Sequence, residues 1–373
     1  MKKRVLIIAG TRPEVIKLAP VVMACRARPE QFDTIYCSTG QHREMLDQAN
    51  RVFRLQTDLD LGLMAPGQTL AGLTSLLFNA LDAAIEKVRP DVIIVQGDTT
   101  SAFVGAMCGF YRKLTVGHVE AGLRTGNIWA PFPEEVNRSI IGKIATLHFA
   151  PTEGSRDNLL REGTPKGRIH VTGNTVVDAL HWVRAHGVLA PTDEITPLVR
   201  TVIQDHRLIL VTSHRRESFG DGLANTCKAL LRIVEAFPGT IIVYPVHLNP
   251  NVQGPVKELL QDHPRIHLLP PVSYPALLWL MSESTLILSD SGGIQEEAPS
   301  FSKPLLVLRE TTERPEVVHA GCAMLVGTDQ ERIVTEATRL LSDQAAYQSM
   351  AGKPNPFGDG SAAERIATLL QKA

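Results

Sequence analysis

The amino-acid sequence predicts an α/β protein built from two doubly wound, Rossmann-like domains. Short apolar runs alternate with amphipathic stretches along the chain, and this alternation stops at a polar, proline-containing stretch, residues 190–197, and then starts again. Continuously apolar strands separated by helices are typical of parallel sheets covered on both faces. The length of 373 residues also suits two domains, at roughly 100–200 residues per domain.

The first set of predicted strands occupies the first 171 residues. These strands are Val5–Ala9, Thr34–Ser38, Asp91–Gln96, Thr115–Val119, Leu147–Ala150 and Arg168–Val171. Between them, apolar residues recur at helical spacing from Leu70 to Val88, which predicts a long amphipathic helix. Right-handed βαβ units would join these strands into one parallel sheet.

The second set of predicted strands begins after residue 207. Its members are Leu208–Thr212, Thr240–Tyr244, Arg265–Leu269, Leu286–Leu288, Pro304–Leu308 and Ala323–Val326. We therefore expect one domain over residues 1–172, a second over residues 173–357, and a C-terminal helix over residues 358–373 that can pack back on the first domain. A ligand is expected in the cleft that the two domains face, at the C-terminal ends of the strands.

Composition excludes several classes of protein. The formal net charge is −1, so the chain as a whole carries no electrostatic footprint for nucleic acid or anionic lipid. The five cysteines are scattered without metal-binding spacing, which favours a reduced, cytoplasmic protein without a metal site. No apolar run approaches the roughly 18 residues that a membrane helix needs. The apolar run after Lys2 and Lys3 is too short for a signal peptide and is interpreted as a strand.

The common phosphate-binding fingerprints are missing. The sequence contains neither G-x-G-x-x-G nor G-x-x-x-x-G-K-[ST], which disfavours a nicotinamide dehydrogenase and a P-loop kinase. Polar residues instead follow several apolar strands, at the positions where open α/β sheets bind their ligands.

In the first half, three such positions stand out. Arg12 and Lys17 flank a predicted helix start, where free N–H groups favour anions, although solvated bases in an ordinary loop are the alternative. Asp98 and Glu120 follow neighbouring strands; Asp98 could instead be a helix N-cap. Glu134 opens a later helix, where it could merely complement the helix dipole.

In the second half, His214 follows a strand and precedes two arginines, which suits a proton carrier or an anion ligand; a structural histidine is the alternative. Ser291, Gly292 and Gly293 open a helix after another strand, and Glu297 lies one turn further along. The glycines let the backbone approach a pyrophosphate, and Glu297 could hold ribose hydroxyls. A plain βα turn explains this pattern less well. Together the two halves predict a nucleotide-linked substrate.

Eight motifs closely resemble the non-hydrolysing UDP-N-acetylglucosamine 2-epimerases of bacteria, and they span nearly the whole chain. They begin at Gly10, Gln41, Gly97, Gly117, His214, Tyr244, Ser289 and Thr311, and read GTRPE, QHREML, GDTT, GHVEAGLRTG, HRRE, YPVHLNP, SDSGGIQEEAP and TTERPE. The resemblance implies a fold of the two-domain glycosyltransferase-B type and a homodimer. It also implies interconversion of UDP-GlcNAc and UDP-ManNAc without a metal or redox cofactor.

The family's residue roles carry over by motif. They make Asp98, Glu120 and Glu134 the acid/base carboxylates, with His214 assisting at the leaving phosphate. They give Arg12 and Lys17 contacts with the nucleotide-sugar, Ser291, Gly292 and Gly293 the diphosphate, Glu297 the ribose and Arg314 the substrate. Gln41 and His247 match positions linked to allosteric activation by UDP-GlcNAc, whereas Glu44 and Gly67 stand where some relatives carry Gln and Arg.

Three other functions share many of these features. A glycosyltransferase would use the same kind of cleft but would require an acceptor and would exchange no C2 proton. A sensor of nucleotide-sugars would bind without turnover, against which the intact Asp98, Glu120 and Glu134 argue. A hydrolysing epimerase would release ManNAc and UDP, and would differ in how well it excludes water.

Overall fold

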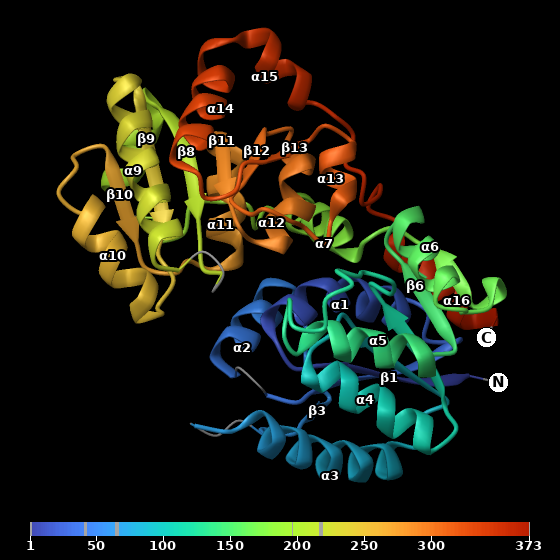
Figure 1. The fold of residues 1–373 in the computed structure, drawn as a ribbon. Coiled ribbons are helices and arrows are strands. Elements are labelled where there is room, and N and C mark those ends of the chain that lie inside the picture. The colour runs from blue at the N-terminus through green and yellow to red at the C-terminus, as the bar shows by residue number, and fades with distance from the viewer. Residues whose placement is uncertain (1, 41–42, 64–66, 196, 216–218, 373) are drawn as a thin grey trace. The chain divides into compact units, whose positions relative to one another are not determined.

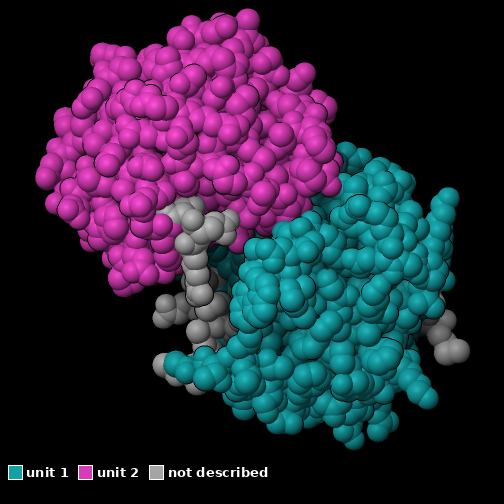
Figure 2. Space-filling model, in the orientation of Figure 1, with its two compact units in different colours: residues 1–185, 357–373 teal, residues 186–356 magenta. Residues whose placement is uncertain are grey.

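The computed structural model describes residues 2–40, 43–63, 67–195, 197–215 and 219–372. Within it the chain divides into two compact units, residues 1–185 with 357–373 (unit 1) and residues 186–356 (unit 2) (Figures 1 and 2). Each unit is an α/β layer structure around its own parallel sheet. The fold is thus the expected pair of Rossmann-like units.

The sheet of unit 1 has seven strands in the order β3-β2-β1-β4-β5-β6-β7, all paired in parallel. The strands are β1 (Lys3–Ala9), β2 (Phe32–Ser38), β3 (Leu59–Asp60), β4 (Val92–Gln96), β5 (Thr115–Val119), β6 (Leu147–Ala150) and β7 (Ile169–Val171). The helices are α1 (Arg12–Arg26), α2 (Arg43–Val52), α3 (Leu70–Val88), α4 (Thr100–Tyr111), α5 (Glu134–Ile144), α6 (Glu153–Arg161), α7 (Thr175–Ala185) and α16 (Ala362–Lys372).

The sheet of unit 2 has six parallel strands in the order β10-β9-β8-β11-β12-β13. The strands are β8 (Arg207–Thr212), β9 (Thr240–Pro245), β10 (Ile266–Leu269), β11 (Ser284–Ser289), β12 (Leu305–Val307) and β13 (Ala323–Leu325). The helices are α8 (Pro197–Asp205), α9 (Asp221–Ala236), α10 (Pro250–Leu260), α11 (Tyr274–Glu283), α12 (Gly292–Glu297), α13 (Pro315–His319), α14 (Gln330–Ser342) and α15 (Gln344–Met350).

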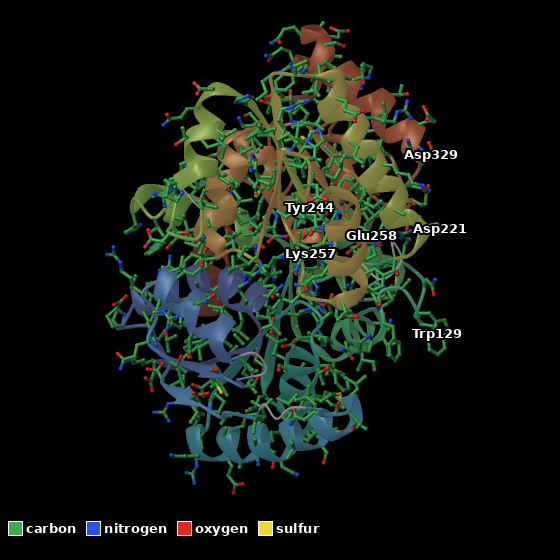
Figure 3. The ribbon with its side chains drawn as sticks, turned by 90° about the vertical axis from the view of Figure 1, so that its left-hand side faces the viewer. Trp129, Asp221, Tyr244, Lys257, Glu258 and Asp329 are labelled. Carbon is green, nitrogen blue, oxygen red and sulfur yellow. The ribbon has the colours of Figure 1, made fainter. Side chains whose placement is uncertain are left out.

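Burial explains why the central strands read as unbroken apolar runs. Residues 5–9 of β1 and 208–211 of β8 are at most 1 % exposed, because helices cover both faces of each sheet. Tyr244 on β9, labelled in Figure 3, is fully buried in the core of unit 2. Trp129, on the loop before α5, projects away from the ribbon and is 72 % exposed.

The last two helices of unit 1 shift its boundary from the expected residue 172. Helix α7 packs on α1, and the C-terminal helix α16 packs on both. The chain leaves unit 1 after α7 and returns at Phe357, whose carbonyl accepts a hydrogen bond of 2.7 Å from the backbone N–H of Asn174. Residues 173–185 therefore belong with the first sheet.

Each sheet has one point at which the strand order reverses. In unit 1 it lies between β1 and β4, and in unit 2 between β8 and β11. The segments that directly follow these four strands carry Arg12, Asp98, His214 and Ser291. In doubly wound sheets such switch points are where ligands bind. No helix in the described part of the chain is long and apolar enough to span a membrane.

Candidate functional site

Glu14 joins the two loops at the switch point of unit 1. Its Oε2 accepts hydrogen bonds from the backbone N–H groups of Gly10 (3.1 Å) and Thr11 (2.7 Å), and its Oε1 accepts one from Thr99 Oγ1 (2.7 Å). Burial raises the pKa of Glu14 to about 7, although these hydrogen bonds act in the opposite direction. Glu14 therefore fixes the loop after β1 against the loop after β4.

Glu120 is held by donors from three separate elements. Lys17 of α1 forms an ion pair with its carboxylate, Gln96 at the end of β4 donates to Oε2, and Asn174 Nδ2 donates to Oε1 at 3.2 Å. The backbone of Glu120 lies in the left-handed region, with φ of 65°, which is unfavourable for a residue with a side chain. The side chain is consequently buried and oriented rather than solvated.

Asp98 is held by two residues of α5. Arg138 of α5 forms an ion pair with its carboxylate, and Asn137 Nδ2 donates to its backbone carbonyl at 2.9 Å. The N-cap of α4 is Thr99, whose hydroxyl accepts from Ala102 N–H at 3.1 Å. Asp98 thus does not cap this helix, which removes the structural alternative for it.

The third carboxylate, Glu134, is the first residue of α5. Its Oε2 is buried and has no hydrogen-bond partner among the described residues. The next residue, Glu135, accepts hydrogen bonds from the backbone N–H groups of Thr125 (3.1 Å) and Gly126 (3.0 Å). Glu135 therefore stabilises the loop after β5. Glu134, in contrast, has a carboxylate oxygen that accepts no hydrogen bond from the described residues.

A buried histidine supports the turn that carries Asp98. His118 lies on β5 and is 1 % exposed; its Nε2 lies 2.7 Å from the carbonyl oxygen of Gly97. Burial lowers the pKa of His118 to about 4, so the ring is neutral and can donate through Nε2. Gly97 has φ of 68°, a conformation that glycine adopts without steric cost.

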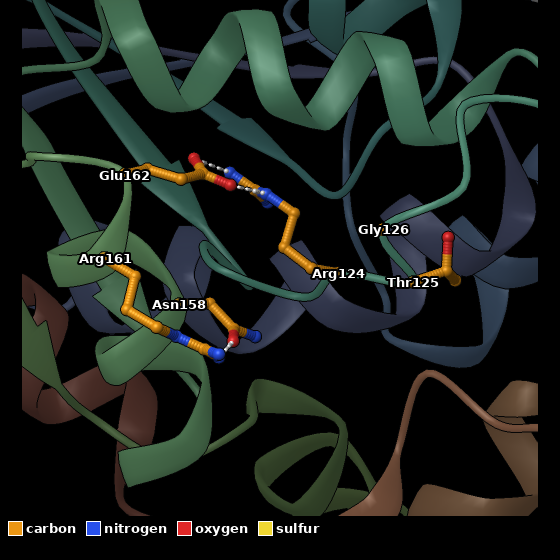
Figure 4. Close-up of a pocket in the computed structure, with 6 residues that line it drawn as sticks. All are labelled: Arg124, Thr125, Gly126, Asn158, Arg161 and Glu162. Atoms are coloured by element: carbon orange, nitrogen blue, oxygen red, sulfur yellow. Dashed lines mark hydrogen bonds and ion pairs between the residues drawn. The ribbon is translucent and has the colours of Figure 1, made fainter.

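A separate cavity of about 340 Å³ lies beside the loop after β5 (Figure 4). It is lined by Arg124, Thr125, Gly126, Asn158, Arg161 and Glu162. Arg124 binds Glu162 through two hydrogen bonds of 2.6 and 2.9 Å, and Arg161 donates to Asn158 Oδ1. Its two arginines are thus bound by neighbouring side chains of the same cavity, and it contains none of the predicted acid/base carboxylates.

In unit 2, His214 is paired with a buried aspartate. His214 Nδ1 lies 3.1 Å from Asp290 Oδ1, and Asp290 directly follows β11. Burial raises the pKa of Asp290, but the hydrogen bonds from His214 and the backbone of Arg215 outweigh it, and the pKa lies below its usual value. His214 also stacks on His247, with ring centroids 5.7 Å apart. Gln41 lies outside the described residues.

The glycine-bearing segment after β11 forms the start of α12. Ser291 is the N-cap, with its hydroxyl making no capping hydrogen bond, and Gly292 and Gly293 are the first two helical residues. Glu297 ends this helix and is 6 % exposed; its Oε1 accepts a hydrogen bond of 3.0 Å from Tyr274. Tyr274, which the sequence analysis did not single out, therefore orients the carboxylate predicted to hold ribose.

Arg314 lies directly on the glycine-bearing segment. A Cβ atom at Gly292 would be 2.5 Å from Arg314 Nη1, so only glycine allows this approach. Glu296 accepts from Arg314 Nε at 2.6 Å and Glu313 from its Nη1 at 2.7 Å. Burial raises the pKa of Glu313, but Arg314, Arg309 and Arg215 lower it well below its usual value. This network holds a guanidinium beside the start of α12.

The sequence pattern indicates the strand-end residues but not most of their partners. The residues it missed are Gln96, Asn174, Arg138, Asp290, Tyr274 and Glu14. Asp290 alone carried a usable signal, because it follows a strand directly, as Asp98 almost does. The others lie within helices or at positions without a distinctive motif. Among the described residues, no group of three or more His, Cys, Asp or Glu side chains could hold a metal ion.

Comparison with known proteins places these features in a family. Residues 23–371 match the family model described as UDP-N-acetylglucosamine 2-epimerase. A UDP-N-acetylglucosamine 2-epimerase of Yersinia pestis is 50 % identical over 370 residues, covering 99 % of this chain and 98 % of that protein.

Two solved structures are similar over nearly the full length. The UDP-GlcNAc 2-epimerase of Neisseria meningitidis, bound to UDP-GlcNAc, is 43 % identical with a TM-score of 0.92 and covers 99 % of this chain and 100 % of its own. The MnaA protein of S. aureus, in a structure with UDP, is 40 % identical with a TM-score of 0.91, covering 99 % of this chain and 96 % of its own.

Proposed function

The chain belongs to the UDP-N-acetylglucosamine 2-epimerase family, and we propose that it inverts C2 of the sugar by eliminating UDP and adding it back. It is an isomerase with a two-domain fold of the glycosyltransferase-B type, and its substrate is UDP-GlcNAc. The product of the forward reaction is UDP-ManNAc. The observation that supports the mechanism is the placement of three carboxylates: Asp98 follows β4, Glu120 follows the neighbouring strand β5, and Glu134 begins α5, the helix whose Arg138 binds Asp98.

The chemistry of the substrate requires elimination. The C2 proton has no neighbouring carbonyl group, so a carboxylate alone cannot remove it at a useful rate. Breaking the bond between C1 and the UDP oxygen makes C1 cation-like and acidifies C2–H. Loss of that proton gives 2-acetamidoglucal and bound UDP. Re-addition of UDP at C1, with protonation of C2 from the opposite face, then gives the epimer.

Unit 1 supplies the acid/base groups in this proposal. Asp98, Glu120 and Glu134 differ in their surroundings: Arg138 neutralises the first, Lys17 the second, and the third keeps a buried oxygen without a hydrogen-bond partner among the described residues. A group that takes up and returns a proton needs such an uncommitted acceptor. We therefore propose Glu134 as a proton carrier at C2, with the ion-paired Asp98 and Glu120 as the other acid/base carboxylates.

Unit 2 supplies the diphosphate and nucleoside contacts. The start of α12 offers backbone N–H groups and the Ser291 hydroxyl, which makes no capping hydrogen bond; with Gly292 and Gly293 these groups suit phosphate oxygens. His214 and Arg314 stabilise the departing diphosphate, and Glu297 accepts hydrogen bonds from the ribose hydroxyls.

Arg12 and Lys17 complete the contacts with the nucleotide-sugar. Arg12 is the first residue of α1, at a helix N-terminus that favours anions. Lys17 reaches the substrate next to its partner Glu120. We also keep Gln41 and His247 as candidates for activation by UDP-GlcNAc, since His247 stacks on His214 and could transmit an effect to it.

Competing functions predict different products. A glycosyltransferase would transfer the sugar to an acceptor, a sensor would leave the substrate unchanged, and a hydrolysing epimerase would release free ManNAc. The non-hydrolysing reaction is favoured because the 50 % identical relatives carry the epimerase name alone.

Turnover of UDP-GlcNAc in D₂O tests the mechanism. We expect NMR to show deuterium at C2 of UDP-ManNAc and of the recovered UDP-GlcNAc, because the carboxylate exchanges its proton with water. Omitting the enzyme is the control. Product without label in either pool would contradict elimination with an exchanging base, and accumulation of free ManNAc would favour the hydrolysing reaction.

We further propose a homodimer formed through unit 1. Helices α3, α4 and α5 pack side by side and carry exposed apolar side chains, among them Phe110 (50 %) and Tyr111 (64 %). Phe78 stacks on Tyr111 and extends this surface. Sedimentation should give a dimer that Phe110→Lys dissociates, whereas Leu160→Lys on α6 should not. A monomeric wild-type chain would contradict the proposal.

A reduced, cytoplasmic setting completes the proposed function. All five cysteines are free and buried, and burial raises the pKa of the Cys25 thiol to about 12, which keeps it unreactive. Buried thiols without disulfides are typical of reducing compartments. Fractionation of the native host should recover the protein with the cytoplasm, and recovery elsewhere would contradict this.

A further inference from the structure

The imidazole of His214 lies against the buried carboxylate of Asp290 in an ion-pair contact. Asp290 is fully buried, and its Oδ2 accepts three hydrogen bonds, from Ser213 Oγ (2.9 Å) and from the backbone N–H groups of His214 (2.8 Å) and Arg215 (2.9 Å). Only Oδ1 remains, and His214 Nδ1 lies 3.1 Å from it.

An ionised carboxylate can only accept, so the contact is favourable only when the imidazole nitrogen facing it carries a proton. The neutral ring is then the tautomer protonated at Nδ1, and the other nitrogen, Nε2, is free to accept. When the ring is charged, both nitrogens carry protons and Nε2 becomes a donor.

The ring connects the interior of unit 2 with its surface. The His214 side chain is 38 % exposed, whereas that of Asp290 has no exposed area. The His214 ring stacks on that of His247, with 25° between the ring planes, and this contact restricts rotation about the side-chain bonds of His214. Nδ1 is therefore held at a buried, anionic partner while the rest of the ring remains accessible.

We propose that Asp290 is a positioning residue: it favours the His214 ring with Nδ1–H toward its carboxylate, so that Nε2 faces the departing diphosphate. The inference rests on the proposed function, which gives His214 its role at the leaving group. When UDP leaves, the charge on the diphosphate oxygen increases, and a charged Nε2–H is a strong donor to it.

Asp290→Asn separates this role from a purely structural one. The amide oxygen can still accept the hydrogen bonds from residues 213–215, but its NH₂ group then faces Nδ1, and a donor there favours the opposite tautomer. We expect kcat to fall on the order of 10²–10⁴-fold, the range of a lost acid/base contribution, while KM and the Kd for UDP change only a few-fold.

Two further readouts keep the test independent of folding. ¹⁵N NMR of labelled histidines, with His214 assigned by its loss in His214→Gln, should show the Nδ1–H tautomer in the wild type and its loss in Asp290→Asn. In the His214→Gln background, Asp290→Asn should lower kcat little further, because the two residues act as a unit.

Ser213→Ala is the matched control, because it removes one donor to Asp290 Oδ2 and leaves the contact with Nδ1 intact. Its spectrum should keep the wild-type tautomer. An Nε2–H tautomer in the wild type, or full additivity of the two substitutions, would overturn the role of Asp290. An active enzyme with either result refutes this inference alone, whereas absence of epimerase activity in the wild type refutes the proposed function.

Discussion

The buried carboxylate of Glu14 makes a quantitative prediction about stability. Burial raises its pKa from 4.5 to about 7 in the folded protein, against hydrogen bonds from Thr99, Thr11 and Gly10. A raised folded-state pKa means that the folded chain binds a proton that the unfolded chain has already lost. The stabilisation is therefore complete below pH 4.5 and disappears as the pH rises through about 7.

The size of the effect follows from the two pKa values. The difference corresponds to about 3 kcal/mol in total, and to about 2.5 kcal/mol between pH 5 and pH 8.5. Glu14→Gln resembles the protonated side chain at every pH. The free energy of unfolding of the wild type should therefore decrease relative to Glu14→Gln by about 2.5 kcal/mol over this range.

Tryptophan fluorescence during urea unfolding can report on unit 1 alone. Of the three tryptophans, Trp279 lies on α11 of unit 2, so Trp279→Phe leaves Trp129 and Trp182 as reporters. Trp182 packs on Phe53, with ring centroids 5.4 Å apart, and should respond when this contact is lost. The free energy of unfolding is then measured at several pH values for Trp279→Phe alone and for Trp279→Phe combined with Glu14→Gln.

Glu30→Gln is the control, because Glu30 is exposed and its removal should leave the pH profile parallel to the wild type. Parallel profiles for Glu14→Gln would refute a raised pKa. An increase in wild-type stability with pH, relative to the variant, would mean that the N–H groups at the start of α1 outweigh burial and keep Glu14 ionised.

Four further substitutions test the site and its supports. Asp98→Asn and Glu120→Gln should each lower kcat on the order of 10²–10⁴-fold in a coupled epimerase assay, with UDP affinity nearly unchanged; near-normal kcat in both would assign them structural roles. Glu297→Ala should weaken UDP binding measured by calorimetry, and an unchanged Kd would remove its contact with ribose. Glu313→Gln leaves buried arginines without their anion and should lower the free energy of unfolding by about 3–5 kcal/mol; a loss below about 1 kcal/mol would mean that water already screens this network.

The strands and the positions of the site residues follow from local rules. The run predicted at 91–96 forms β4 over Val92–Gln96, and the predicted helix from Leu70 to Val88 is α3. Because parallel strands end at one edge of a sheet, residues after these strands could be named from the sequence. Strand β3 was missed because two residues, Leu59 and Asp60, are too short to show any periodicity.

The partners of the site residues could not be predicted in the same way. Lys17 and Glu120 are separated by 103 positions, and their contact depends on how α1 packs against the end of β5. Arg138 meets Asp98 only because of the rotation of α5 about its axis. Such pairs depend on tertiary packing, and helical charges with the same local pattern occur on any solvated face.

The two switch points use opposite arrangements of charge. In unit 1, the predicted catalytic groups are the carboxylates Asp98 and Glu120. Each pairs with a basic side chain of a helix, Arg138 of α5 and Lys17 of α1. In unit 2, the basic side chains are the groups predicted to contact the ligand, and buried carboxylates hold them. Asp290 pairs with His214, and Glu296 and Glu313 pair with Arg314. The first arrangement keeps anions available for a proton, and the second keeps donors available for a diphosphate. Because each site places cations against anions, neither site stands out in the formal net charge of −1 of the whole chain.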